Sequence, residues 1–431
     1  MHQRDLTSLV CYALFCAHAT FQAAGNKSKK AEYNVARQGI LLQLSHLLLK
    51  DYICGNMTKK LVVGIDVRDL KIAKTGAKTY LEEILNEFKS DSHGCEIKFF
   101  DSSLPVYTGP NKFLKLIEHI RYFFWKQLVL PIKAYANNCD LLFCPDYFVP
   151  YIHLGYKTIP MFYDDSFYEY PENCNPVWLK MFHLLGVGAA KRAPYIITSS
   201  EYTKNRLVHF TGIDPDKIIP IHLAPKKAAA KKTDRDFIPS FKTPTSKFIL
   251  HVGVLEKRKN LVRLVEAFKL LRDKGHTDYS LVFVGQPSSK DDLDGSSELM
   301  ATIQREQLQD FVMMSGYVSD DDLAYFYKYA TVYVFPSLNE GFGLPILEAF
   351  HQQLPVLVSN NTAMPEVGGD AVLCFDPFNS VDISQKIEMI IDDPELRDTL
   401  IKRGNERIKL FSWDRNATEL VKIFNRAVNK N

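Results

Sequence analysis

The chain has 431 residues, of which 46% are hydrophobic and 24% are charged, and its formal net charge is +3. Because domains usually contain about 100 to 200 residues, this length and this hydrophobic content predict two ordinary cores. The net charge is too small for the length to favour a nucleic-acid-binding protein. The eight cysteines contain no CxxC pair, which is typical of reduced thiols in a cytosolic enzyme and argues against a disulfide framework or a zinc site.

Residues 1–58 are predicted to be an extension that is disordered or spurious. The stretch LTSLVCYALFCAHATFQAAG has an apolar centre followed by small residues, as a secretory signal peptide does, but the residues before it, MHQRD, are barely basic. The stretch MTKKLVVGIDVR, which begins at Met57, is typical of a cytosolic start that leads directly into a buried strand. A signal peptide stays the alternative interpretation.

From Met57 onward, short apolar runs alternate with helix-length segments, as expected of βαβ units whose parallel sheet is covered on both faces. The strands expected in the first half are residues 60–66, 95–100, 141–145, 157–163 and 194–200. The strands expected in the second half are residues 247–253, 279–285, 312–316, 331–337, 355–360 and 371–376. Asn260 and Ser319 are the expected N-caps of two intervening helices, and Gly275 is an expected C′ residue.

The segment KKAAAKKTDRDFIPSFKTPTS is charged, contains two prolines and lacks a hydrophobic period, so residues 226–246 are predicted to be a linker. It separates an N-terminal domain at 59–225 from a C-terminal domain at 247–412, and residues 413–431 form a last amphipathic helix capped by Ser412. The predicted fold class is α/β, with two Rossmann-like doubly wound domains facing each other across a cleft and the last helix crossing back. In such sheets, ligands bind at the carboxyl ends of the strands.

The stretch VYVFPSLNEGFGLPILEAF, residues 332–350, runs from an expected strand through a glycine-flanked loop into a helix. Gly341 and Gly343 allow close backbone approach, and the helix start offers unpaired N–H groups to a phosphate. A carboxylate would repel a phosphate, so Glu340 and Glu348 make sense if they face hydroxyl-rich groups such as a sugar and a ribose. Alternatively, both carboxylates complement the helix dipole.

The segment EGFGLPILE, followed by PVLVSNNTAMPEVGGDAVLCFDP, resembles the E-x7-E region of retaining GT-B glycosyltransferases, the group 1 or family 4 glycosyltransferases, with a mannosyltransferase-like pattern. The segment HVGVLEKRKNLVRLVEAFKLL resembles the first strand and helix of their nucleotide domain. By this resemblance Arg258 and Lys259 clamp a diphosphate, where preorganised cations stabilise the charge of a leaving group, and Glu340 holds the transferred sugar. The alternative interpretation of the basic turn is a solvated surface.

The resemblance also implies a set of donor-binding residues and no metal. GIDVRDLKIAKTGAKTYLEEIL, residues 64–85, resembles the first strand and glycine loop of these enzymes, and SGYVSDDDLAYFYKYA, residues 315–330, resembles the segment near the nucleobase. The implied donor-binding residues are Gly76, Val318, Gly341, Phe342, Gly343, Leu344 and Glu348.

Tyr163 and Asp164 stand where the family often has a His-Asp pair near the reacting sugar. They are expected to contact the sugar or the acceptor. A neutral tyrosine can hydrogen-bond a sugar hydroxyl but cannot act as a general base near neutral pH. The alternative for Tyr163 is an aromatic side chain that packs at the cleft wall.

Residues 111–131, NKFLKLIEHIRYFFWKQLVLP, are both basic and aromatic. A helix of this kind could lie on an anionic membrane and bring the enzyme to a lipid-linked acceptor. The other interpretation is an ordinary helix whose apolar stripe packs on the sheet. Its basic and aromatic residues are Lys112, Phe113, Lys115, Arg121, Phe123, Phe124, Trp125 and Lys126.

The resemblance therefore implies a retaining glycosyltransferase in polysaccharide or glycoconjugate synthesis. Its co-substrate would be a nucleotide-sugar, with GDP-mannose favoured and UDP-sugars next, and its acceptor a glycan or a lipid-linked hydroxyl. No cofactor and no metal are expected. The expected location is the cytoplasm, or the inner face of the membrane if the enzyme is a peripheral membrane protein. A nucleotide-sugar epimerase, a phosphorylase of the same fold and a non-catalytic sugar-nucleotide-binding module are the alternatives.

Overall fold

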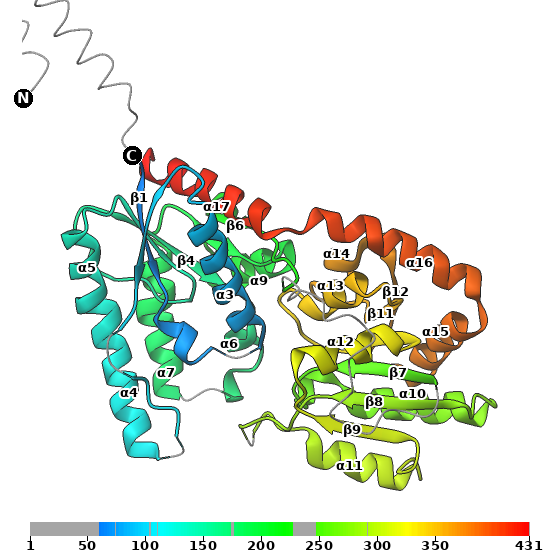
Figure 1. The fold of residues 1–431 in the computed structure, drawn as a ribbon. Helices are drawn as coiled ribbons and strands as arrows, with labels where there is room; N and C mark the ends of the chain where they lie inside the picture. The colour runs from blue at the N-terminus through cyan, green and yellow to red at the C-terminus, as the bar shows by residue number, and fades with distance from the viewer. Residues whose placement is uncertain are drawn as a thin grey trace, which may run out of the picture. The chain divides into compact units, whose positions relative to one another are not determined.

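The computed structural model describes residues 60–430, apart from residues 74, 103–104, 110, 174–175, 227–246 and 291. The predicted extension at 1–58, and the predicted linker apart from residue 226, lie outside the described residues. The described chain builds two parallel sheets with helices around each (Figure 1). The prediction of an α/β fold with two Rossmann-like lobes is therefore confirmed.

The first lobe contains a parallel sheet in the order β2-β1-β3-β4-β5-β6. Its strands are β1 Val62–Asp66, β2 Glu96–Phe100, β3 Leu141–Cys144, β4 Lys157–Phe162, β5 Ile196–Thr198 and β6 Ile218–Pro220. The chain reverses direction across the sheet between β1 and β3, and ligands of open α/β sheets bind beyond the strand ends at such a switch point. The sequence analysis predicted the first five strands but missed β6, a short strand that ends in a proline.

Helices cover this sheet, and two π-helical segments, Trp125–Val129 and Phe182–Val187, lie between them. The helices are α3 Thr75–Ser90, α4 Lys112–Phe124, α5 Leu130–Ala136, α6 Ser166–Glu169, α7 Pro176–Met181, α8 Gly188–Ala190 and α9 Glu201–Thr211. Because β1 and β3 are buried along their whole lengths, the lobe has an apolar centre on which these helices pack.

The second lobe contains a parallel sheet in the order β12-β11-β10-β7-β8-β9, so its switch point lies between β7 and β10. Its strands are β7 Lys247–Val252, β8 Tyr279–Val284, β9 Val312–Gly316, β10 Val332–Phe335, β11 Val356–Ser359 and β12 Val372–Phe375. Each of these strands lies within a predicted apolar run. The helices are α10 Leu261–Asp273, α11 Ser296–Arg305, α12 Asp320–Tyr329, α13 Leu344–His351, α14 Met364–Gly368, α15 Ser380–Asp392 and α16 Pro394–Arg407.

The last helix, α17 Trp413–Val428, crosses back from the second lobe to lie beside α3 of the first (Figure 1). Its predicted N-cap is confirmed, because the Ser412 side chain accepts a hydrogen bond from the Arg415 N–H. The buried Trp413 indole N–H donates to the Pro225 carbonyl at 2.8 Å, which ties the helix to the end of the first lobe.

Candidate functional site

Two segments that follow the neighbouring strands β7 and β10 meet at the switch point of the second lobe. Arg258 and Lys259 lie in a 3-10 turn after β7, and Glu340 lies in the loop after β10. The Lys259 ammonium lies 2.6 Å from the Glu340 carboxylate, and the Arg258 guanidinium lies 3.1 Å from the same oxygen. The structure thus brings together the three predicted catalytic residues.

The charges in this cluster compensate one another in a largely buried place. Burial alone would raise the pKa of Glu340, but the contacts with Lys259 and Arg258 outweigh it and lower that pKa to about 2. Burial also lowers the pKa of Lys259, although Glu340 opposes this effect. The Arg258 side chain remains 31% exposed, whereas that of Lys259 is 9% exposed, so Arg258 is the more exposed of these two cleft-lining cations.

Asn260 holds the basic turn against the loop after β10. It stands at the N-cap position of α10 in a left-handed conformation with φ of 58°, but its side chain caps nothing. Instead the amide donates to the carbonyls of Pro336 and Pro377 at 3.1 and 2.7 Å. The prediction of a capping side chain is wrong here, because the amide is used to join three segments around the site.

Glycine is required at positions 341 and 343 of this loop for different structural reasons. A Cβ atom on Gly341 would lie 2.0 Å from the Tyr163 carbonyl oxygen, so only glycine permits the first lobe to approach the loop this closely. Gly343 has a φ of 108° and occupies the N-cap position of α13, where a glycine is the residue least strained. Helix α13 thus begins at the cleft next to a residue without a side chain, although Pro345 in its first turn has no N–H group and the Ile346 N–H bonds to the Gly343 carbonyl.

Glu348 lies one turn into α13 and accepts a hydrogen bond from the Tyr327 hydroxyl at 2.8 Å. Burial raises the pKa of Glu348, and the Tyr327 hydrogen bond opposes that shift. Glu348 therefore differs electrostatically from Glu340: a neutral hydroxyl contacts it, not a pair of cations. Such a carboxyl group suits a neutral polyol better than a phosphate.

All twelve predicted site residues line one cleft of about 2560 Å³. Gly76 at the start of α3 belongs to the first lobe, and a Cβ atom there would meet the Leu344 side chain of the second lobe at 3.4 Å. Val318 and Phe342 of the second lobe also line the cleft. Since single small-molecule pockets measure about 300 to 1,000 Å³, this cleft has room for two substrates.

Tyr163 and Asp164 directly follow strand β4 on the first-lobe side of the cleft. The Tyr163 hydroxyl donates to the Pro145 carbonyl at 2.8 Å, and burial holds its pKa well above the usual range, which excludes it as a base. Asp164 accepts hydrogen bonds from the Tyr147 hydroxyl and the Ser166 N–H, both at 3.2 Å. Burial raises the pKa of Asp164, and Arg258 across the cleft partly opposes it.

Sequence reasoning missed a charged cluster at the switch point of the first lobe. The buried Lys126 ammonium lies 2.6 Å from the carboxylates of both Asp66 and Asp146, and Asp146 also accepts from the Tyr122 hydroxyl. Asp146 and Asp69 line the cleft. The prediction that Lys126 is part of a basic helix face is wrong, because the π-helical turn directs it inward, where it is 1% exposed. A single lysine within a largely apolar helical segment gives no signal of this kind.

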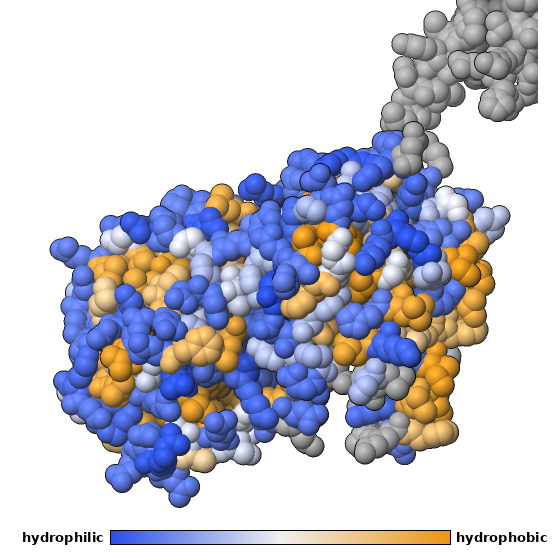
Figure 2. Space-filling view, turned by 180° about the vertical axis from the view of Figure 1, so that it is seen from behind, coloured by the Kyte–Doolittle hydropathy of each residue, from blue (hydrophilic) through white to orange (hydrophobic). Residues whose placement is uncertain are grey.

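Helix α4 exposes an apolar surface that continues into α5 (Figure 2). The apolar side chains of this surface are exposed, so the interpretation that the apolar stripe of residues 111–131 packs on the sheet is wrong for them. Trp125 and Leu130, which follow α4, are buried instead. Within the described residues, no helix has the length and apolar character required to cross a membrane. The exposed apolar residues of this surface are Phe113, Leu114, Leu116, Ile117, Ile120, Phe124, Leu128, Ile132 and Tyr135.

Comparison with known proteins relates the second lobe to a family. Residues 232–407 match the family Glycosyl transferases group 1. The O-antigen chain mannosyltransferase B of Escherichia coli is 28% identical over 377 residues, covering 85% of this chain and 93% of that protein. The serotype-specific mannosyltransferase WbdA of Escherichia coli is 30% identical over 251 residues, which cover 57% of this chain and 30% of that protein.

Solved structures show the same fold at low identity. Sucrose-phosphate synthase from Thermosynechococcus elongatus superposes with a TM-score of 0.64 at 18% identity, covering 85% of this chain and 99% of that one. WaaG, a glycosyltransferase involved in lipopolysaccharide biosynthesis, superposes with a TM-score of 0.59 at 14% identity, covering 84% and 99%. Residues 232–407 therefore form a glycosyl transferases group 1 domain, and the described chain has the fold of the GT-B glycosyltransferase structures.

Proposed function

We propose that this enzyme transfers mannose from GDP-mannose to a hydroxyl of a glycan or lipid-linked acceptor, with retention at the anomeric carbon, and that a UDP-sugar is the next candidate donor. The names of two relatives support mannose and polysaccharide synthesis. The observation that carries the proposal is that Arg258 and Lys259 both contact Glu340 at the carboxyl ends of the adjacent strands β7 and β10. This geometry provides fixed positive charge beside a carboxylate.

The unequal exposure of the two cations divides their roles. Arg258 faces the cleft, and its planar guanidinium can contact two phosphate oxygens at once. Lys259 is deeper and holds the Glu340 carboxylate, whose low pKa keeps it an acceptor for the hydroxyls of the transferred sugar. Glu348 with Tyr327 would receive the ribose hydroxyls. Because side chains and the α13 amides supply the positive charge, no metal and no further cofactor are required in this scheme.

The transfer itself needs a bond made and a bond broken on the same face of the sugar. The acceptor oxygen bonds to the anomeric carbon as the bond from that carbon to the β-phosphate oxygen breaks. The acceptor proton passes to an oxygen of the departing nucleoside diphosphate, and Arg258 with the α13 N-terminus stabilises the negative charge that develops there. Glu340 is held by two cations, which makes it a weak nucleophile and favours this same-face attack over a covalent intermediate.

The donor is tested by thermal shift and by product analysis. GDP-mannose at 100 times its Kd should stabilise the protein by about 2.7 kcal/mol through mass action, and UDP-, dTDP- and ADP-sugars serve as comparison ligands. Incubation with donor and acceptor should yield an α-linked product by NMR. A β-linked product would contradict retention. Turnover of the donor alone into an isomeric nucleotide-sugar would instead identify an epimerase.

We also propose that the apolar surface of α4 and α5 rests on an anionic membrane at the cytoplasmic face, where a lipid-linked acceptor is presented. Lys115 and Lys133 lie among its exposed apolar side chains, a combination that favours an interfacial position. Sedimentation with phosphatidylglycerol vesicles should fall sharply in Phe113→Ser/Ile120→Ser/Phe124→Ser. It should be unchanged in a control that removes three exposed apolar side chains of the second lobe, Phe378→Ser/Val381→Ser/Met389→Ser. Equal binding by both variants would contradict the membrane contact.

A further inference from the structure

Hydroxyl groups at the start of α9 in the first lobe contact the loop between β10 and α13 in the second lobe. The hydroxyl oxygens of Ser199, Ser200 and Thr203 lie 2.9, 2.6 and 3.2 Å from the Gly341 carbonyl oxygen. All three residues are at most 1% exposed. Gly341 directly follows Glu340, so these contacts hold the backbone next to the carboxylate of the proposed sugar site.

Each hydroxyl has one proton, and the surrounding contacts decide where it goes. Ser200 accepts the Thr203 N–H at 3.1 Å as the N-cap of α9, and of the two acceptors within reach of its own proton the Gly341 carbonyl at 2.6 Å is nearer than the Thr203 hydroxyl at 3.0 Å. Ser199 has the Tyr163 carbonyl nearer, at 2.7 Å, than that of Gly341. Thr203 lies closer to Gly341 than to Tyr163. Ser200 and Thr203 therefore fill the two lone pairs of the Gly341 carbonyl, and Ser199 satisfies Tyr163.

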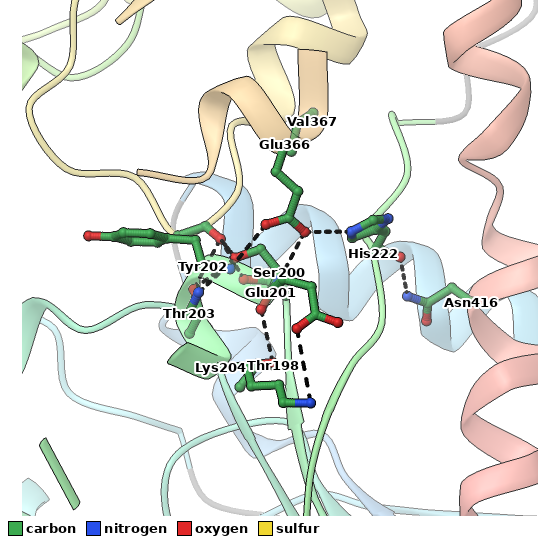
Figure 3. A network of polar contacts seen from close by, with 12 residues as sticks. Thr198, Ser200, Glu201, Tyr202, Thr203, Lys204, His222, Glu366, Val367 and Asn416 are labelled. Carbon is green, nitrogen blue, oxygen red and sulfur yellow. Dashed lines mark hydrogen bonds and ion pairs between the residues drawn. The ribbon is translucent and has the colours of Figure 1, made fainter. Parts of the chain in front are cut away.

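A carboxylate of the second lobe caps the same helix turn from outside. Glu366 of α14 accepts the backbone N–H groups of Glu201 and Tyr202 at 2.9 and 3.0 Å, and the His222 ring donates to it at 2.8 Å (Figure 3). Burial would raise the pKa of Glu366, but these hydrogen bonds lower it. Asn416 of α17 donates to the His222 carbonyl, so the last helix supports this contact as well (Figure 3).

The other flank of Glu340 is held in the same way. The amide of Asn339, the residue before Glu340, donates to the Asp165 carboxylate of the first lobe at 3.0 Å. Arg206 of α9 donates to the other oxygen of Asp165 at 2.5 Å. Groups of the first lobe thus hold Asn339 and Gly341, the residues on either side of Glu340. Cations of the second lobe hold the Glu340 carboxylate.

We infer that Ser200 and Thr203 are positioning residues for glycosyl transfer: they hold the Gly341 carbonyl so that Glu340 is set at the angle that the transferred sugar requires. The inference rests on the proposed function of Glu340. It makes the second-lobe donor site dependent on engagement with the first lobe. A shift of about 1 Å in a reacting group can reduce turnover by about 10²-fold, so loss of these contacts should be visible in kcat.

The test compares two pairs of variants matched for what they remove. Thr203→Val removes a hydroxyl from the first turn of α9, and Thr211→Val removes one from its last turn, where it donates to Leu207. Ser200→Ala removes the N-cap of α9, and Ser412→Ala removes that of α17. Each cap should cost about 1 kcal/mol of stability, so melting temperatures should fall by similar amounts in the two cap variants.

Only the positioning variants should lose turnover. We expect kcat to fall about 10-fold in Thr203→Val and in Ser200→Ala, to recover in Thr203→Ser and to stay near wild type in the two controls. The Kd for the free nucleoside diphosphate should stay within about 3-fold, because Arg258 is untouched. Wild-type kcat in both α9 variants, or a kcat loss in the controls that equals theirs, would overturn the inference.

The outcomes also separate this inference from the proposed function. If Glu340→Ala abolishes transfer while Thr203→Val and Ser200→Ala are fully active, the sugar site stands and the positioning role fails. If Glu340→Ala is active, the assignment of Glu340 itself is wrong, whatever the α9 variants do.

Discussion

Two carboxyl groups on opposite sides of the cleft, Glu340 and Asp164, have opposite electrostatic surroundings. In the second lobe, Glu340 contacts two cations and its pKa falls to about 2. In the first lobe, Asp164 accepts from a neutral hydroxyl and an amide, and burial raises its pKa. The cations beside Glu340 thus suit the anionic donor of the proposed function, and the hydroxyl and backbone amide that contact Asp164 suit its hydroxyl-bearing acceptor.

The largest expected effect on turnover comes from removing Glu340, the carboxylate that contacts two cations. Glu340→Ala should reduce kcat by about 10²- to 10³-fold, as removal of a single preorganised polar group does in other enzymes. It also leaves Lys259 buried without its partner, so the melting temperature should fall. The double variant Glu340→Ala/Lys259→Met, which removes both charges, is the control: it should recover stability but not turnover. Turnover within a few-fold of wild type would exclude Glu340 from the sugar site.

The pH dependence of stability gives the next largest effect. The pKa of Glu340 falls from an ordinary value of 4.5 to about 2 on folding. A shift of this size corresponds to about 3 kcal/mol, which is fully present above pH 4.5 and is lost as the pH falls toward 2. Urea unfolding of wild type and Glu340→Gln should therefore show a difference that shrinks between pH 5 and pH 3. A difference that is constant over this range would contradict the ion-pair assignment.

The second lobe was predictable because its chemistry lies on short continuous motifs directly after clear apolar runs. Arg258 and Lys259 follow β7, and Glu340 follows β10. Parallel strands bring such segments to one edge. The roles within that edge were less predictable: Asn260 occupies an N-cap position, but its side chain bonds to two proline carbonyls instead.

The first lobe was harder because its cluster is assembled from distant segments. Asp66, Lys126 and Asp146 each look like a solvated charge in sequence, and only the fold brings them within 2.6 Å. The π-helical turn that directs Lys126 inward adds one residue to a helical period, which a regular periodicity of apolar residues does not reveal. The contacts of Ser200 and Thr203 with Gly341 depend on packing between lobes, which no local pattern encodes.

A smaller effect would sharpen the assignment of the exposed cation. Arg258→Lys keeps the positive charge but removes the planar group that contacts both Glu256 and Glu340. Because lysine cannot make bidentate contacts with a phosphate, kcat/KM for the donor should fall about 10-fold. Lys257→Arg, a charge-preserving change at the neighbouring exposed position, is the matched control and should have no effect. Equal kcat/KM for both variants would show that only charge matters at residue 258.

The smallest effect tests the first-lobe side. Asp164→Asn keeps an oxygen that accepts hydrogen bonds from the Tyr147 hydroxyl and the Ser166 N–H. It removes a carboxyl group whose pKa is raised by burial. A carboxyl with a raised folded pKa loses stability as the pH rises through that pKa, so the variant should be slightly more stable than wild type at pH 7. The gain should disappear below the ordinary pKa of 3.8, where both states are protonated. Urea unfolding at matched pH values measures this gain, and a variant less stable than wild type at pH 7 would mean that the attraction of Arg258 exceeds the cost of burial.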